Sequence, residues 1–251
     1  MSESLADYLE LPEACHLGKR VFKKLFHEHA PLQAADARAL QGDVDTIVWQ
    51  HTLKPTTIAI PAFEDDEREY LEIAVLEGRL HNTKHATRLA ELVHRAIPYP
   101  VLLILTHERS SAMSLAHKRY SRAEKGAIVA DPPVTSHWIA ADRISDIDRQ
   151  FVDSLAIAGL PQTHLLATYT AWMDRVLAIA CAQRTGIYRL SDSLDTVPIR
   201  VEALTGCRRL EVEIAELRTR IRRETQFNRQ VELNSTLKNL ERKLHDLTKT
   251  L

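Results

Sequence analysis

Cysteine and glycine are scarce in this sequence, and each scarcity argues against a class of site. The three cysteines, Cys15, Cys181 and Cys207, lie far apart, form no C-x-x-C pair and are odd in number. They favour neither a disulfide framework nor a cysteine zinc cage, so a reducing, cytoplasmic setting is expected. Seven glycines leave little material for phosphate-cradling loops, and no G-x-x-x-x-G-K-S/T, G-x-G-x-x-G or G-x-S-x-G motif occurs. Nucleotide-driven chemistry is therefore not expected.

Long apolar runs and an excess of one charge are also missing. The longest strongly apolar run, Ala96 to Thr106, is interrupted by Pro98 and Pro100 and is shorter than the roughly 20 residues of a membrane helix. We expect no membrane span, and no secretory signal at an N-terminus that carries carboxylates. The net charge of −1 creates no global field toward nucleic acid or acidic lipid. Only residues 205–251, with 11 basic against 7 acidic side chains, form a basic segment.

The first 143 residues mix helix and strand patterns. Apolar spacing over 21–26 predicts a short helix, and a stripe over 33–51 predicts a second one. Asn82 or Thr83 caps a predicted third helix, which ends at Pro98. The predicted strands cover residues 56–60, 70–77, 101–105, 112–117 and 134–140. We therefore predict an α+β domain over 1–143, with a mixed, largely antiparallel sheet and packed helices.

The second half of the chain has helical periodicity. A helical segment is predicted over 144–190, followed over 199–251 by a long C-terminal coiled-coil-like helix with heptad seams. The seam residues are Leu210, Ile214, Leu217, Ile221, Phe227, Leu233, Leu237, Leu240, Leu244 and Leu247.

The two parts of this seam are out of phase. Ile221 and Leu237 are 16 residues apart, where two heptads would require 14. Residues 224–236 are therefore either a discontinuity within one helix or the bend of a helical hairpin. Because no glycine or proline follows Gly206, one helix of about 40 residues, on the order of 60 Å long, is favoured. Such a helix needs a partner to be stable.

A loose match to a metal-dependent nuclease is the main catalytic hypothesis. Asp43 or Asp45, a strand with Glu72 and Glu77, and Arg79 resemble the layout of acids and a base that holds Mg²⁺. Arginine replaces the usual lysine, however, and strand alternation puts Glu72 and Glu77 on opposite faces. Carboxylates exposed at the end of a strand are the favoured alternative. No cofactor is expected except Mg²⁺ under this alternative.

The histidines and serines do not predict another catalytic site. His81 and His85 form an i, i+4 pair, but the H-E-x-x-H pattern of a metalloprotease is missing. No metal site is expected from them. Ser110, Ser111 and His107 lie close together in the sequence, but no acid is identifiable that would complete a hydrolytic triad.

Two basic clusters are candidates for nucleic-acid binding. Lys118, Arg119 and Arg122 surround an aromatic residue, as expected where a strand edge meets phosphate. The tail adds Arg218, Arg222, Arg223 and Arg229. In both cases a solvated face, or the charged flank of a coiled coil, is the favoured alternative.

Several stretches of sequence occur in one order through most of the chain. They are LPEACHLGKRVFKKLFHEH, IVWQHTLKPTTIAI, AIPYPVLLIL with AHKRYS, and RETQFNRQVELNSTLKNLERKL. Together they resemble a bacterial domain-of-unknown-function family, in which IPYP and QFN-x-x-VELN are the unusual elements. Similar proteins look as if they are typically encoded beside DEAD/DEAH-type helicases and DNA methyltransferases in restriction-like or phage-defence islands. The resemblance implies an accessory role and transfers no catalytic residue.

The residues that carry the resemblance are interpreted first as structural residues. Tyr99, between two prolines, is predicted to form a rigid turn from helix to strand. The other matching positions are Trp49, Pro55, Pro98, Pro100, Lys118 and Asn234.

The leading hypothesis is a non-catalytic adaptor in a DNA-targeting defence system. Its C-terminal helix would associate with itself or with a helical partner protein, such as a helicase or a DNA methyltransferase. The alternatives are a divergent nuclease and a nucleic-acid-binding module, each working with that partner. No membrane partner is expected.

Overall fold

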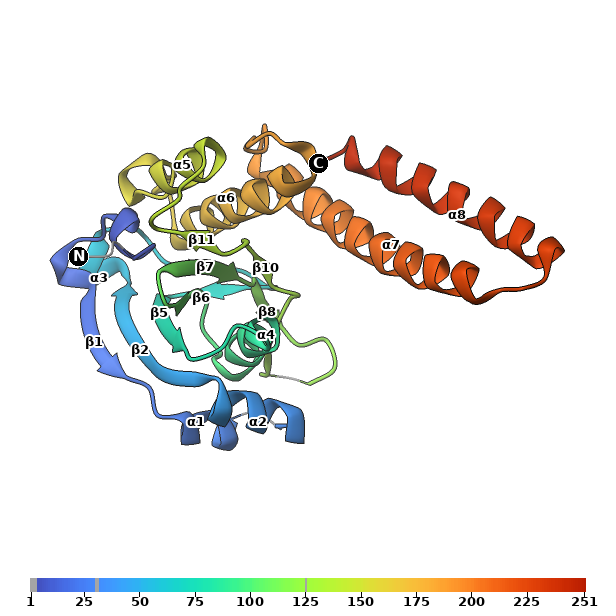
Figure 1. Ribbon diagram of the computed structural model, residues 1–251. Helices are drawn as coiled ribbons and strands as arrows, with labels where there is room; N and C mark the ends of the chain where they lie inside the picture. Colours follow the sequence, from blue (N-terminus) through green and yellow to red (C-terminus); the bar gives the residue numbers. More distant parts are fainter. Residues whose placement is uncertain (1–3, 30–31, 125) are drawn as a thin grey trace. The chain divides into compact units, whose positions relative to one another are not determined.

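The computed structural model describes residues 4–29, 32–124 and 126–251 (Figure 1). Its contacts divide the chain into two compact units. The sheet unit contains the residues up to Ala180 together with Tyr188–Leu190, and the hairpin unit contains Cys181–Ile187 with Ser191–Leu251. The helices over 146–180 therefore belong with the sheet.

A mixed sheet forms the centre of the sheet unit, as predicted. Its order is β1-β2-β5-β6-β7-β10, and β11 also pairs with β7. β5 and β6 are parallel and the other pairings are antiparallel. The strands are β1 His16–Arg20, β2 Val44–Leu53, β5 Ile73–Leu80, β6 Val101–His107, β7 Ser110–Leu115, β10 Val134–Thr135 and β11 Ile139–Ala140. Two short ribbons pair β3 Phe63–Glu64 with β4 Glu69–Tyr70, and β8 Lys118–Tyr120 with β9 Ile128–Ala130.

Helices cover the two central strands on both faces. α4 Ala86–Ala96 connects β5 to β6, because a parallel pair requires a crossover. Alternate residues of the two strands, such as Leu76 and Leu103, share a core with α4, α1 Lys23–His29 and α2 Ala34–Gly42. On the other side, Tyr169 of α6 Leu165–Thr185 donates its hydroxyl hydrogen toward the carbonyl oxygens of Val101 and Ala116. This burial explains the continuous aliphatic runs of β5 and β6.

α6 is a core helix. It is the one helix in the described part of the chain that is long and apolar enough to cross a membrane, and 78% of that stretch is buried within the protein. Trp172 of α6 is fully buried and donates its indole N–H to the carbonyl oxygen of Leu155, 2.9 Å away. Its apolar surface therefore packs against protein. α5 Asp146–Asp153 precedes it, and short 3-10 helices cover Asp7–Leu9, Glu13–Cys15, Ile157–Gly159 and Leu194–Thr196.

Two predictions near the N-terminus are wrong. The helix predicted over 33–51 ends at Gly42, and the following residues form β2. The β-branched residues at the start of β2 fit a pleated strand better than a helix, and β5 supplies the partner. The strand predicted over 56–60 is instead the short helix α3 Pro55–Ile58. Pro55 suits its first turn, and the Thr57 hydroxyl accepts the Lys54 backbone N–H at 3.0 Å.

The C-terminal region is a helical hairpin, so the favoured prediction of one continuous helix is wrong and the alternative is correct. α7 Val197–Arg223 and α8 Phe227–Thr248 lie side by side (Figure 1). The chain turns at 224–226, where the Glu224 carboxylate accepts the backbone N–H groups of Thr225 and Gln226 at 2.9 Å each. Polar side chains can make such a turn without glycine or proline. The change of phase in the heptads therefore marks the turn.

Candidate functional site

The predicted nuclease residues lie at different places along β2 and β5. Asp43 pairs with Nδ1 of His85 at 2.5 Å, and Asp45 lies 3.9 Å from His81. Glu77 accepts a hydrogen bond of 2.9 Å from the side chain of Gln50.

Glu72 and Arg79 lie near opposite ends of β5. Thr46, beside Asp45, is the register partner of Arg79, whereas Glu72 immediately precedes the strand. At about 3.3 Å per residue, roughly 20 Å or more of strand separates Glu72 from Arg79. Within the described ranges, no three His, Cys, Asp or Glu side chains gather as a metal site requires. The structure thus does not bring the five residues to one place.

Lys118 is buried, which corrects its prediction as a phosphate-binding surface residue. Only 2% of its surface is exposed. Its Nζ donates to the carbonyl oxygens of His94 and Ile97, the latter 2.6 Å away, at the C-terminal end of α4. A cation is favourable there because helix carbonyls at this end lack partners. Burial lowers the pKa of Lys118 to about 8. Its role is to anchor β8 to α4.

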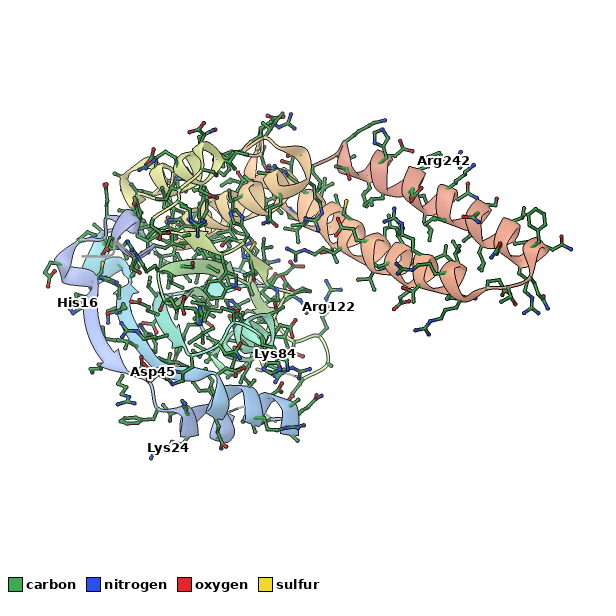
Figure 2. The ribbon with its side chains drawn as sticks, viewed as in Figure 1. His16, Lys24, Asp45, Lys84, Arg122 and Arg242 are labelled. Atoms are coloured by element: carbon green, nitrogen blue, oxygen red, sulfur yellow. The ribbon has the colours of Figure 1, made fainter. Side chains whose placement is uncertain are left out.

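The other two members of this basic cluster have different surroundings. Arg119 pairs with Asp131 at 3.0 Å, and Asp131 immediately follows the neighbouring strand β9. Arg122 lies exposed in the loop after β8 (Figure 2). The cluster in the sequence is therefore not a cluster of free cations in the fold.

A buried polar network around Lys118 was not predicted. His94 lies 3.1 Å from the Ser114 hydroxyl, and Nδ1 of His117 lies 2.5 Å from the hydroxyl of Tyr70. Burial, reinforced by the charge of Lys118, lowers the pKa of His94 to about 3. Burial, reinforced by Arg68, lowers the pKa of His117 to about 4. The network joins residues 114–118 to His94 and Tyr70, which lie 20 or more positions earlier in the chain, so no local pattern indicates it.

The predicted seam residues pack within one chain. On α7, Leu210, Ile214 and Leu217 are buried. The leucines of α8, namely Leu233, Leu237, Leu240, Leu244 and Leu247, are half-buried, as is Ile221. The two out-of-phase seams thus belong to the two helices of the hairpin.

The helices approach closely near the open end of the hairpin. A Cβ at Gly206 would lie 2.7 Å from the end of the Leu247 side chain. Arg200 donates to the carbonyl oxygen of Leu251 at 2.8 Å, which ties the two ends of the hairpin together.

Phe227 is not part of the seam, contrary to its prediction. It begins α8 and is 75% exposed. Val231, one turn later on the same face of α8, is 53% exposed. The turn end of the hairpin therefore presents two neighbouring apolar side chains to solvent. We call residues 218–231 the hairpin tip.

Arginines are concentrated in the same segment as these apolar side chains. The hairpin tip contains five arginines and one acidic residue, whereas the rest of 205–251 contains six basic and six acidic residues. Arg218 pairs with Glu241 at 2.8 Å. Arg222, Arg223 and Arg229 are exposed. The basic character of the tail is therefore concentrated at the turn.

Comparison with known protein families agrees with the fold-wide resemblance in the sequence. The model of one family, described as Domain of unknown function (DUF4391), matches residues 9–244. The chain belongs to this family. The match includes the whole sheet and both hairpin helices up to Leu244. No curated protein and no solved structure matches the chain. Membership in the DUF4391 family supplies no activity, so function has to be argued from the sites.

Proposed function

We propose that the chain is a non-catalytic accessory subunit that binds a protein partner through the hairpin tip. The observation that carries the proposal is the exposed pair Phe227 and Val231 within a group of arginines. Aromatic and arginine side chains are the residues that most often dominate the energy of a protein interface. An apolar pair beside positive charge fits a partner surface with a hydrophobic pocket and an acidic rim.

The internal packing of the hairpin supports the tip as the binding element. The seam residues of α7 are covered by α8, so they are not available to another chain without unfolding the hairpin. Phe227 has no such cover, although burying an aromatic side chain is favourable by about 2 kcal/mol. A partner that covers Phe227 would supply this energy.

Several sequence stretches resemble those of proteins encoded beside helicases and DNA methyltransferases. This resemblance supports a partner of one of these two classes. We therefore propose a DEAD/DEAH-type helicase or a DNA methyltransferase of a bacterial DNA-targeting defence system as that partner. The chain's contribution would be assembly, and the partner would perform the chemistry on DNA.

Binding of the purified full chain to each candidate partner, measured by interferometry at several salt concentrations, tests the proposal. Phe227→Ala should weaken binding at least tenfold, because it removes the anchor. Arg222→Glu with Arg223→Glu should weaken it and reduce its salt dependence. Arg242→Glu is the matched control, since Arg242 is an exposed arginine of α8 outside the tip (Figure 2).

The proposal fails if neither partner binds, or if the tip variants bind as tightly as the wild type. Circular dichroism of each variant shows whether the hairpin remains helical. Binding of a DNA duplex that depends on the same arginines, without a protein complex, would replace the proposal with nucleic-acid binding.

A further inference from the structure

A groove on the sheet unit has a composition that suits a small-molecule or single-strand ligand. It encloses about 670 Å³ and is lined by residues of β1, α1, β2, β9 and the end of α4. This volume lies in the range of ligand pockets.

Two aromatic rings meet in this groove. The ring centroids of Trp49 and Tyr99 are 5.8 Å apart and the rings are tilted by 45°. Trp49 donates its indole N–H to the carbonyl oxygen of His51 at 2.9 Å, so its polar atom is already satisfied. Tyr99 is held between Pro98 and Pro100, which restrict the backbone, and 39% of its surface is exposed. The rings are therefore pre-positioned, with aromatic surface open to a ligand.

Positive charge surrounds the rings. The lining contains Lys19, Arg20 and Arg95 and no acidic residue. Lys19 is the register partner of Trp49 across β1 and β2, so the two side chains start from the same face of the sheet. Among the residues that the structure describes, neither Lys19 nor Arg20 has an ion-pair partner.

Arg95 is fixed in place by a buried carboxylate. Asp36 binds Arg95 at 2.9 Å and Arg88 at 2.8 Å. Burial of Asp36 acts to raise its pKa, but the hydrogen bonds from the two arginines outweigh this and lower the pKa. Asp36 is therefore charged at neutral pH and orients the guanidinium of Arg95 at the edge of the groove.

We propose that the groove binds a nucleotide unit, with its base stacked on Tyr99 and Trp49 and its phosphate held by Lys19, Arg20 and Arg95. Base stacking on aromatic rings beside cations is the usual chemistry of sequence-tolerant nucleotide binding. A purely aliphatic ligand would leave the three cations unused, and an acidic peptide would leave the rings without a planar partner. The nucleotide unit has two sources, a free nucleotide or a single-stranded nucleic acid. This inference does not depend on the hairpin tip.

Isothermal titration of the full chain with four probes tests the proposal. The probes are adenosine 5′-monophosphate, adenosine, ribose 5-phosphate and a single-stranded oligodeoxythymidylate of ten nucleotides. Adenosine 5′-monophosphate or the oligonucleotide should bind at least tenfold more tightly than either adenosine or ribose 5-phosphate. Comparable affinity for the two nucleotide probes indicates a free nucleotide. Much tighter, salt-dependent binding of the oligonucleotide indicates a single strand.

Tyr99→Ala should weaken nucleotide binding on the order of tenfold, as expected for loss of a stacking surface. Lys19→Gln, at an exposed position of β1, should weaken binding of the three phosphate-containing probes and leave adenosine unchanged. Lys84→Gln is the control, because Lys84 is an exposed lysine outside the groove (Figure 2). Absence of binding by both nucleotide probes, equal binding of ribose 5-phosphate, or full affinity in both Tyr99→Ala and Lys19→Gln would overturn the proposal.

Discussion

Two buried histidines make the stability of the sheet unit depend on pH. His94 and His117 have pKa values of about 3 and about 4 in the folded chain, mainly because burial penalises their charged forms. In the unfolded chain a histidine has a pKa of about 6.5. Between about pH 4 and 6.5 the unfolded chain therefore binds more protons. Stability from these groups is present above pH 6.5 and is lost as the pH falls.

The size of the effect follows from the two pKa differences. At pH 5 each histidine is almost fully protonated in the unfolded chain and almost fully neutral in the folded chain. This difference lowers the free energy of unfolding by about 2 kcal/mol per histidine. The two together remove about 4 kcal/mol of the free energy of unfolding, out of the roughly 5–15 kcal/mol of a typical domain. We expect a steep loss of stability between pH 6.5 and 5.

Urea unfolding at pH 7.5, 6.5, 5.5 and 5.0, followed by tryptophan fluorescence, measures this loss. Trp172 is fully buried in the sheet unit and reports on its unfolding. His94→Gln should reduce the slope of stability against pH by about 1 kcal/mol per pH unit between pH 6.5 and 5.0. His245→Gln, at an exposed position on α8, should leave the slope unchanged. If His94→Gln and His117→Phe both keep the wild-type slope, the reasoning is refuted.

Two further predictions concern Lys118 and the hairpin seam. Lys118→Met leaves the carbonyl groups at the end of α4 without their donor, which should cost about 2 kcal/mol in urea unfolding. The pKa of Lys118 is about 8 in the folded chain, against an ordinary value of 10.5. The free energy of unfolding of the wild type should therefore rise by about 2 kcal/mol from pH 7.5 to 9.5. A rise of the same size in Lys118→Met would contradict this. Leu244→Asp places a carboxylate between α7 and α8 and should unfold the hairpin but leave the sheet unit intact. Loss of helical circular dichroism with unchanged tryptophan fluorescence is the expected result, because all three tryptophans lie in the sheet unit. A fully helical variant would contradict it.

Local physical signals in the sequence determined much of the fold. The aliphatic runs of β5 and β6 predicted buried strands, because only a strand covered on both faces has apolar residues at every position. Pro98 predicted the end of α4, since proline cannot continue a helix. The break in heptad phase marked the region of the hairpin turn, although the lack of glycine and proline favoured the wrong alternative.

Only the tertiary structure decided which side chains meet. Val44 and its neighbours fit either the apolar stripe of a helix or a strand, and pairing with β5 selected the strand. Lys118 appeared as one of several surface cations, but its contacts to α4 come from residues more than 20 positions away. The groove at Trp49 and Tyr99 is likewise assembled from five separate elements. Periodicity and turn chemistry act over a few residues, whereas burial and site geometry depend on contacts between distant segments, which no local pattern encodes.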